Sequence, residues 1–366
     1  MHNKLYKYIH THHFLNQKSP SDRKKLELEA YLQKLSDKME EGKGRVCVTG
    51  GGGFIASMII KRLLLEGYSV NTTVRPGKSK KDLSFLTNLP GASRTLQVFN
   101  ADLNNPESFI PAIEGCIGVF HTATPYDLQK DEDDKILTKR AIGGALGILK
   151  ASISSKTVKR VVYTGSAAAI IYSGKEVEDL DESYWSDIDF MYKTKPFAWN
   201  IAISQTLTEK AVLEFAEQHE HELDVVTLIL PYVIGPFICS KLPTSIEYAF
   251  SWLFGEDGLG IFVRYPLVHV DDVARAHIFL LEHPNPKGRF ICSLSGTVTF
   301  EEIADILQAK FSEFQTPTLE SLKEIAVWTI PSINSKKLKD AGFKFNYGTK
   351  EIIEETIQCC KENGYL

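Results

Sequence analysis

The stretch RVCVTGGGGFIASMIIKRLLLEGYSVNTTVR, residues 45–75, places a run of four glycines between two apolar, β-branched segments. Residues 45–50 read as a β-branched strand, residues 54–67 as an amphipathic helix ending at Gly67, and residues 69–75 as a second strand. A strand, a glycine turn and a helix in this order are typical of the first unit of a doubly wound α/β fold. We therefore expect a parallel sheet with right-handed crossovers.

Four further apolar segments continue this alternation. They are TLQVFNAD (95–102), GVFHTA (118–123), KRVVYTGS (159–166) and DVVTLILP (224–231), with helix-like blocks between them. The series predicts a Rossmann domain over 45–235. The pattern after 235 is less regular, so we expect 236–366 to form mainly a C-terminal substrate-binding lobe, with some strands returning to the large sheet. A substrate pocket would then close over the carboxyl edge of that sheet.

The composition favours a small-molecule partner. Of 366 residues, 43% are hydrophobic and 24% charged, the net charge is -4 and the pI is near 6.2. The absence of a long basic block argues against nucleic acid or an anionic membrane as a partner. No apolar run is long enough to span a membrane, and six cysteines without ligand spacing predict free thiols and no metal site. We expect a cytoplasmic protein that is a monomer or a weak homodimer.

Residues 1–44 differ from the rest of the chain. The segment is polar and basic and holds four histidines, at positions 2, 10, 12 and 13. We interpret it as a flexible leader rather than as a metal site.

The glycine run predicts a dinucleotide site. Gly50, Gly53 and Ala56 form a GxxGxxA pattern directly after a strand and directly before a helix. Glycines there permit a tight turn and close approach of a pyrophosphate to the helix N-terminus. The second strand ends at Arg75, where a cation accommodates the 2′-phosphate of NADP(H) and an acid would hold the ribose of NAD. Lysines 78, 80 and 81 follow, so NADP(H) is favoured.

A set of longer motifs extends over the chain. They are VTGGGGFIAS, FNADLNNPESF, GVFHTATP, GALGILKA, DESYWSD, TLTEKAVLEF, VVTLILPYVIGPF, VHVDDVARAHI and IQCCKENGYL. With these motifs, residues 39–366 resemble the extended short-chain dehydrogenase/reductases of plant specialised metabolism, in the dihydroflavonol reductase and vestitone reductase group. The resemblance implies a Rossmann fold and NADP(H)-dependent reduction of a carbonyl compound.

The same resemblance implies a set of cofactor contacts. These are Gly50, Gly53, Phe54 and Ile55 at the turn, Arg75 and Lys81 at the 2′-phosphate, Asp102 and Leu103 at the adenine, His121, Thr122 and Ala123 along the middle, Gln205 at the ribose and Pro231 at the nicotinamide. Packing at a strand end or in a turn can also explain six of them: Asp102, Leu103, His121, Thr122, Ala123 and Pro231.

The catalytic positions depart from the family pattern. Reductases of this group use a Ser to orient the carbonyl, a Tyr to donate a proton, and a Lys to lower the pKa of that Tyr. Ser166 matches the Ser, but the Tyr and Lys positions fall on Ile201 and Gln205. General acid catalysis typically contributes about 10² to 10⁴ in rate, and isoleucine has no proton to give. We expect ordinary ketone reduction to be badly impaired and NADP(H) binding to be weakened but retained.

The expected pocket is apolar. Ala167, Ala168, Ala169, Ile170 and Ile171 follow Ser166. We expect Ile170, Ile171 and Ile201 to line a pocket for a largely apolar carbonyl compound, whereas the alanines fit the pocket wall and the core equally well.

Three interpretations remain open at this level. The protein is a reductase whose proton comes from water or another group, with Tyr126, Tyr192 and Tyr232 as candidate donors; an activated enal or an iminium would need less acid help than a ketone. Alternatively, it catalyses a non-redox cyclisation, isomerisation or dehydration with NADP as a structural group and Ser166 polarising an oxygen. In the third, it is a non-catalytic binding protein.

Overall fold

The computed structural model describes residues 42–77, 82–125, 133–175, 177, 179–254, 261–314 and 327–366. Residues 1–41 of the expected leader lie outside this part of the chain, as do Tyr126 and the three lysines at 78, 80 and 81. At the end of the leader, the Lys43 backbone N–H donates to the Gly67 carbonyl at 3.2 Å.

A seven-stranded sheet forms the centre of the molecule, and every neighbouring pair in it is parallel. Its strands are β1 (Arg45–Val48), β2 (Ser69–Val74), β3 (Leu96–Asn100), β4 (Gly118–His121), β5 (Arg160–Ser166), β7 (Asp224–Leu230) and β11 (Gly288–Ile291). The order is β11-β7-β5-β4-β1-β2-β3, so the direction of winding reverses between β1 and β4. The predicted doubly wound Rossmann fold is confirmed, and ligands of such sheets bind at this reversal.

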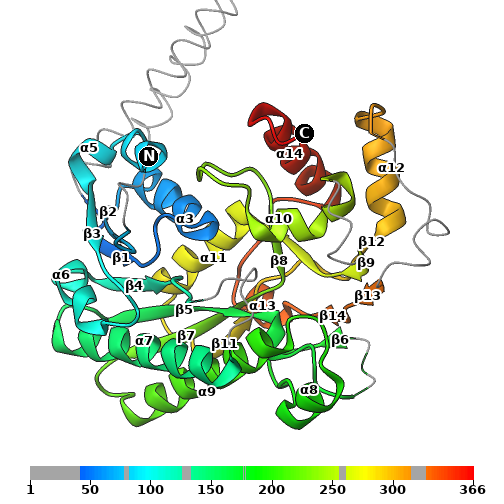
Figure 1. The fold of residues 1–366 in the computed structure, drawn as a ribbon. Coiled ribbons are helices and arrows are strands. Elements are labelled where there is room, and N and C mark those ends of the chain that lie inside the picture. Colours follow the sequence, from blue (N-terminus) through cyan, green and yellow to red (C-terminus); the bar gives the residue numbers. More distant parts are fainter. Residues whose placement is uncertain are drawn as a thin grey trace, which may run out of the picture.

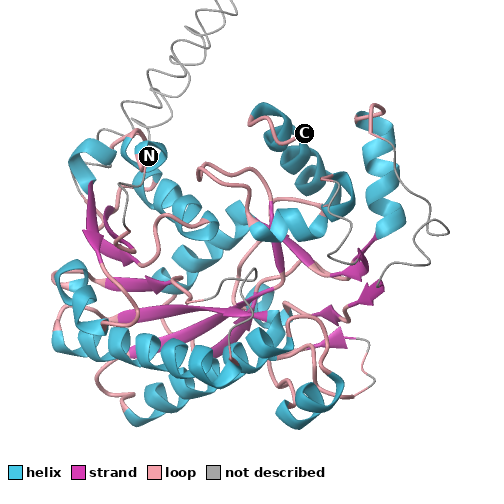
Figure 2. Ribbon diagram, viewed as in Figure 1, coloured by secondary structure: helices cyan, strands magenta, loops and turns pink. Residues whose placement is uncertain are grey.

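Helices cover both faces of the sheet (Figures 1 and 2). Helices α7 (Asp134–Ser154) and α9 (Trp199–Gln218) pack together on one face, and α3 (Phe54–Leu65) and α11 (Val270–Glu282) on the other. Side chains of β1 alternate between the two layers, because Val46 and Val48 join the core under α3 whereas Cys47 joins the core under α7. Short helices α4 (Ser84–Thr87), α5 (Ala92–Thr95), η1 (Pro106–Phe109) and α6 (Ile110–Ile113) connect the strands of the N-terminal half.

The remaining elements gather beyond the carboxyl edge of the sheet (Figure 1). They include the parallel pair β8 (Tyr232–Ile234) and β10 (Leu267–His269), and a three-stranded sheet of β12 (Val298–Thr299), β9 (Ile261–Tyr265) and β13 (Val327–Thr329). The pair β6 (Asp179–Leu180) and β14 (Ser332–Ile333) lies nearby, with helices η2 (Ala167–Ala169), α8 (Ile188–Thr194), α10 (Thr244–Ala249), η3 (Ser251–Leu253), α12 (Phe300–Lys310), α13 (Lys336–Asp340) and α14 (Thr349–Glu362). The C-terminal lobe begins before α11 and β11 in the sequence, but α11 and β11 belong to the Rossmann domain, where β11 is an edge strand of the large sheet.

A buried ion pair fixes helix α9 to the sheet. The Arg289 guanidinium of β11 donates to both carboxylate oxygens of Glu209, at 3.0 and 3.2 Å. The Thr227 hydroxyl of β7 donates to the same carboxylate at 2.6 Å, and Trp185 covers the guanidinium at 3.6 Å. Because Glu209 is 1% exposed, these contacts supply the partners that a buried charge needs. They hold the helix that carries Ile201 and Gln205.

Candidate functional site

The glycine turn has the geometry that close approach of a phosphate requires. Gly50 has a φ of +76°, which disfavours other residues, and the Gly53 N–H donates to the Gly50 carbonyl at 2.9 Å. Gly53 is the N-cap of α3 and has no side chain to occupy the first N–H groups. No acidic residue lies in the first turn of α3 either. The turn therefore leaves a helix N-terminus suited to an anion.

Gly51, which the GxxGxxA pattern leaves out, has the least space of the four glycines in the turn. A Cβ at this position would lie 2.1 Å from Thr72 Oγ1 and 3.1 Å from Ile60 Cδ1. Thr72 is fully buried and donates its hydroxyl to the Val48 carbonyl at 2.7 Å. The contact between the turn and β2 therefore requires glycine. Its only signal in the sequence is the run of four glycines.

Thr49 joins the ends of β1 and β4 beneath the turn. Its Oγ1 accepts the N–H groups of Thr122 at 3.1 Å and Ala123 at 3.0 Å. Because two donors already reach this oxygen, its own proton is directed to His121 Nδ1, 3.0 Å away. Burial lowers the pKa of His121 to about 4, so the ring is neutral at pH 7. The sequence did not single out Thr49.

A groove of about 840 Å³ runs along the turn. Among the expected cofactor residues, those lining it are Gly50, Gly53, Phe54, Ile55, Arg75 and Thr122. Arg75 is exposed at the end of β2, and the segment from Cys239 to Ser245 forms another part of the wall. A glycine floor, an uncapped helix N-terminus and a cation at one end fit a phosphorylated dinucleotide.

Other expected cofactor residues do not line this groove. Leu103 is buried against Gly144, and His121 is 3% exposed. Asp102 accepts the side-chain and backbone N–H groups of Asn104. Ala123 packs beneath Gly50, and a Cβ added at Gly50 would lie 3.1 Å from the Ala123 Cα. The expected contacts of these four residues with the cofactor stay predictions.

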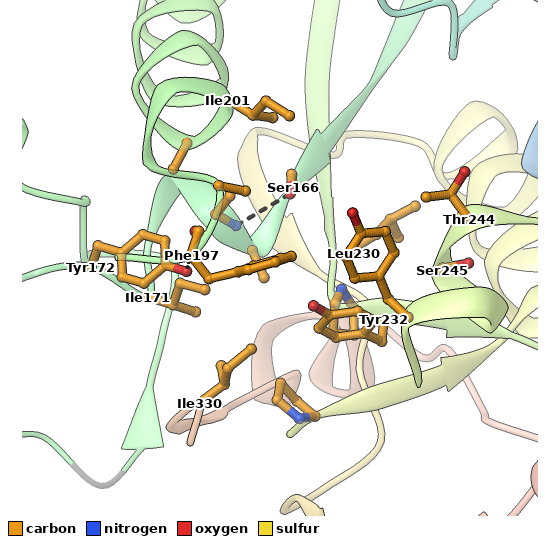
Figure 3. Close-up of a pocket in the computed structure, with 17 residues that line it drawn as sticks. Ser166, Ile171, Tyr172, Phe197, Ile201, Leu230, Tyr232, Thr244, Ser245 and Ile330 are labelled. Atoms are coloured by element: carbon orange, nitrogen blue, oxygen red, sulfur yellow. Dashed lines mark hydrogen bonds between the residues drawn. The ribbon is translucent and has the colours of Figure 1, made fainter. Parts of the chain in front are cut away.

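A second, smaller cavity of about 230 Å³ lies beyond the ends of β5 and β7. Ile171 and Ile201, which the sequence predicted for the pocket, line it together with Ser166, the match to the catalytic Ser, and with Pro231, the residue expected at the nicotinamide. Ser166 Oγ accepts the Ala168 N–H at 3.2 Å. Figure 3 shows Ser166 near the middle of the cavity wall with Ile201 above it on α9.

The prediction that Ile170 lines the pocket is wrong. Ile170 is completely buried and packs in a cluster with Ile229, Ile291 and Ile333. The turn η2 directs Ile171 into the cavity and Ile170 into the core. Of the three preceding alanines, Ala167 and Ala168 line the cavity and Ala169 is completely buried.

Gln205 lies on α9 one turn after Ile201, as the helical spacing predicted. It is 9% exposed and is not among the residues that line either cavity. Its expected contact with a ribose stays a prediction.

Four aromatic residues line the cavity beside its aliphatic ones, and the sequence analysis named only one of the four, Tyr232. Tyr172, Phe197, Tyr232 and Tyr248 all line it, from four separate segments. Tyr172 directly follows Ile171, so the sequence could have predicted that it lies near Ser166. The positions of Phe197 and Tyr248 at the cavity depend on the tertiary fold. Tyr192, a candidate proton donor, is outside the cavity wall, and its hydroxyl donates to Asp134 Oδ2 at 2.6 Å.

The two cavities adjoin at the start of α10. Thr244 and Ser245 line both of them. Ser245 is held by donating its hydroxyl to the Val233 carbonyl at 2.6 Å. The arrangement therefore joins a dinucleotide-sized groove to a small apolar chamber.

A model of the NAD dependent epimerase/dehydratase family matches residues 46–291. The chain belongs to this family. It is 56% identical over 330 residues to vestitone reductase of Medicago sativa, covering 90% of this chain and 100% of that protein. It is 42% identical over 329 residues to dihydroflavonol 4-reductase of Callistephus chinensis, covering 89% of each.

Solved structures of this family agree with the fold. The crystal structure of alfalfa vestitone reductase has a TM-score of 0.79 at 55% identity, covering 88% of this chain and 100% of that chain. Yeast methylglyoxal/isovaleraldehyde reductase Gre2, complexed with NADPH, has a TM-score of 0.71 at 26% identity, with coverages of 88% and 100%. The family member described here is therefore an extended short-chain dehydrogenase/reductase related to plant reductases.

No group of three or more His, Cys, Asp or Glu side chains in the described part is placed to hold a metal ion. Within the same ranges, no helix has the length and apolar character needed to cross a membrane.

Proposed function

We propose that this protein is an NADP(H)-dependent reductase of a small, largely apolar carbonyl-derived electrophile, and that it works without the Tyr and Lys proton relay of its family. The observation that carries the proposal is the junction at Thr244 and Ser245, where the dinucleotide groove opens beside a chamber containing Ser166. Relatives that are named as reductases, one of them solved with NADPH, support the choice of reaction.

The groove residues have separable roles in this proposal. The turn at Gly50 and Gly53 and the N-terminus of α3 would hold the pyrophosphate, and Arg75 would hold the 2′-phosphate. When bound, NADPH supplies a hydride. Pro231 lies in the wall of the small chamber, where it would limit the position of the nicotinamide.

The chamber residues determine which acceptor is suitable. Ser166 can donate a hydrogen bond to a substrate oxygen, whereas Ile201 excludes water and offers no proton. An acceptor that is already electron-poor, such as an enal or an iminium, needs little or no help from an acid. The geometry therefore favours an activated electrophile over an ordinary ketone.

Cofactor binding is tested first, without any substrate. We expect NADPH to bind more tightly than NADH in a nicotinamide fluorescence titration. Arg75→Ala should weaken NADPH binding about tenfold or more and leave NADH binding nearly unchanged, because a charge-assisted contact to the 2′-phosphate is lost. Equal effects on both dinucleotides would contradict the assignment of Arg75.

The reaction is tested by following NADPH absorbance and product structure together over a panel of activated and unactivated carbonyl compounds. Reduced products with matching NADPH consumption support the proposal. Rearranged products without NADPH consumption would instead establish the non-redox alternative, and cofactor binding without any conversion would favour a binding protein.

The missing relay is tested by the double change Ile201→Tyr with Gln205→Lys. If only the relay is absent, the rate of ketone reduction by the variant should rise by at least about 100-fold, the lower end of the 10² to 10⁴ that acid catalysis typically contributes. Each single change is the control, since neither alone supplies both the proton and the charge. No gain in the double variant would show that more than the relay differs.

A further inference from the structure

Four aromatic rings lie in the wall of the small chamber, among residues that are mostly aliphatic. Tyr172 lies just after η2, Phe197 just before α9, Tyr232 in β8 and Tyr248 in α10, and all four line the chamber. None of the 17 lining residues is acidic or basic. In Figure 3, Tyr172 and Phe197 lie on one side of Ser166, and Tyr232 lies on the other.

Contacts among the lining residues, and one with the buried Tyr265, hold these rings in place. Phe197 meets Tyr248 edge to face, with centroids 5.4 Å apart, and Tyr232 meets the buried Tyr265 at 5.2 Å. The Tyr172 hydroxyl donates to the Phe197 carbonyl at 2.9 Å. The fold therefore holds the four rings in place without a ligand.

Tyr172 and Tyr232 also stay neutral over the physiological range. Burial raises the pKa of Tyr172 to about 12. Burial and then the neighbouring tyrosines raise the pKa of Tyr232 well above its usual value. Neither of these phenols is therefore poised to ionise, and each presents an intact ring to the chamber.

We propose that the chamber is an aromatic cage for a small organic cation, and that the substrate class of the reductase is a cyclic tertiary iminium. The electron-rich faces of Tyr and Phe attract cations, and cages of such rings recognise ammonium groups that carry no N–H. An iminium spreads its charge and makes no strong hydrogen bonds to water, so moving it into an apolar chamber costs less than moving a primary ammonium. A basic side chain in the wall would oppose such a ligand, and none is present.

An iminium substrate also explains why the chamber has no acidic group to donate a proton. Hydride from NADPH forms a C–H bond at the iminium carbon, and the C=N π pair becomes the lone pair of nitrogen. The products are a neutral tertiary amine and NADP⁺, so no proton is required. Ile201 at this wall is then compatible with turnover, whereas a ketone would leave an alkoxide to be protonated. This inference rests on the proposed reductase function for its chemistry, but its binding part can be tested alone.

The binding test uses two bicyclic probes of similar size without any cofactor. The cation is 2-methyl-3,4-dihydroisoquinolinium, and the neutral compound is 1-tetralone. We expect calorimetry to show the cation binding about tenfold or more tightly, because desolvated aromatic faces attract a cation and not a neutral ketone. Equal affinities, or tighter binding of the ketone, would overturn the cage.

Two substitutions at Tyr248 separate ring from hydroxyl. Tyr248→Leu removes an aromatic face. The affinity for the cation should fall by about 10- to 30-fold, whereas the affinity for tetralone should change by less than about threefold. Tyr248→Phe keeps the aromatic face, so its affinity for the cation should stay within about threefold of that of the unaltered protein. If Tyr248→Phe loses as much cation binding as Tyr248→Leu, the hydroxyl and not the ring recognises the ligand, and the cage is wrong.

Turnover distinguishes this inference from the function on which it rests. With NADPH present, the iminium should be reduced to 2-methyl-1,2,3,4-tetrahydroisoquinoline in a one-to-one ratio with NADPH consumed, and tetralone should not be reduced. Reduction of neutral carbonyls with no cation binding would refute the cage and keep the reductase. Cation binding without NADPH consumption would keep the cage and refute the reductase.

Discussion

Gly51→Ala is expected to destabilise the protein strongly, although it adds only one methyl group. The new Cβ would lie 2.1 Å from Thr72 Oγ1 and 3.1 Å from both Thr72 Cβ and Ile60 Cδ1. Thr72 is fully buried, so its hydroxyl cannot swing into solvent, and moving it breaks the 2.7 Å hydrogen bond to the Val48 carbonyl. Overpacking costs about 1–3 kcal/mol, and a stranded buried carbonyl costs about 1–3 kcal/mol more. We therefore expect a loss of about 2–6 kcal/mol in the free energy of unfolding.

The measurement is denaturant unfolding followed by circular dichroism, with thermal melting as a second readout. Gly52→Ala in the same glycine run is the matched control, because nothing lies within 4 Å of its Cβ position. Thr72→Ala removes the atom at 2.1 Å, so adding it to Gly51→Ala should cost less than the two separate losses together. A Gly51→Ala variant as stable as Gly52→Ala, or strictly additive losses with Thr72→Ala, would refute this reasoning.

Three further predictions concern stability. Arg289→Met leaves the Glu209 carboxylate buried without its cation and should cost about 3–5 kcal/mol in denaturant unfolding; a loss below about 1 kcal/mol would contradict the buried pair. Ala198→Gly should raise the melting temperature, because Ala198 has a φ of +52° and relief of about 1–2 kcal/mol exceeds the added chain entropy; a lower value would argue against strain. Burial lowers the pKa of His121 and of His277 to about 4. When the protein unfolds, both histidines can bind protons below about pH 6.5. Between about pH 6.5 and 4, these two groups should therefore lower the free energy of unfolding by about 2.7 kcal/mol per pH unit, measured in a series from pH 7 to 4. No loss of stability on the acid side would contradict their neutral burial.

Local patterns in the sequence were enough to predict the Rossmann layers. The apolar runs at 45–48 and 224–231 and the helical spacing after Phe54 each extend over few residues, and the structure has strands and a helix there. The glycine turn at Gly50 is also local, because its backbone and the start of α3 are adjacent in the chain. These features depend on the 2.0- and 3.6-residue periods of strands and helices, which a sequence displays directly.

The walls of the chamber depended on the tertiary structure. Ile170 and Ile171 are neighbours of the same type, and only packing against Ile229 and Ile333 decides that one is core and the other faces the cavity. Tyr248 lies more than 75 residues from Tyr172, and no periodicity relates them.

The sequence by itself determined the fold class, the turn at Gly50 and Gly53, and the absence of a proton donor at Ile201. The tertiary structure decided that Thr72 makes Gly51 necessary and that four aromatic rings share one cavity. The physical reason is that side-chain identity and local periodicity are properties of short segments, whereas the direction of a side chain and its neighbours depends on how distant segments pack.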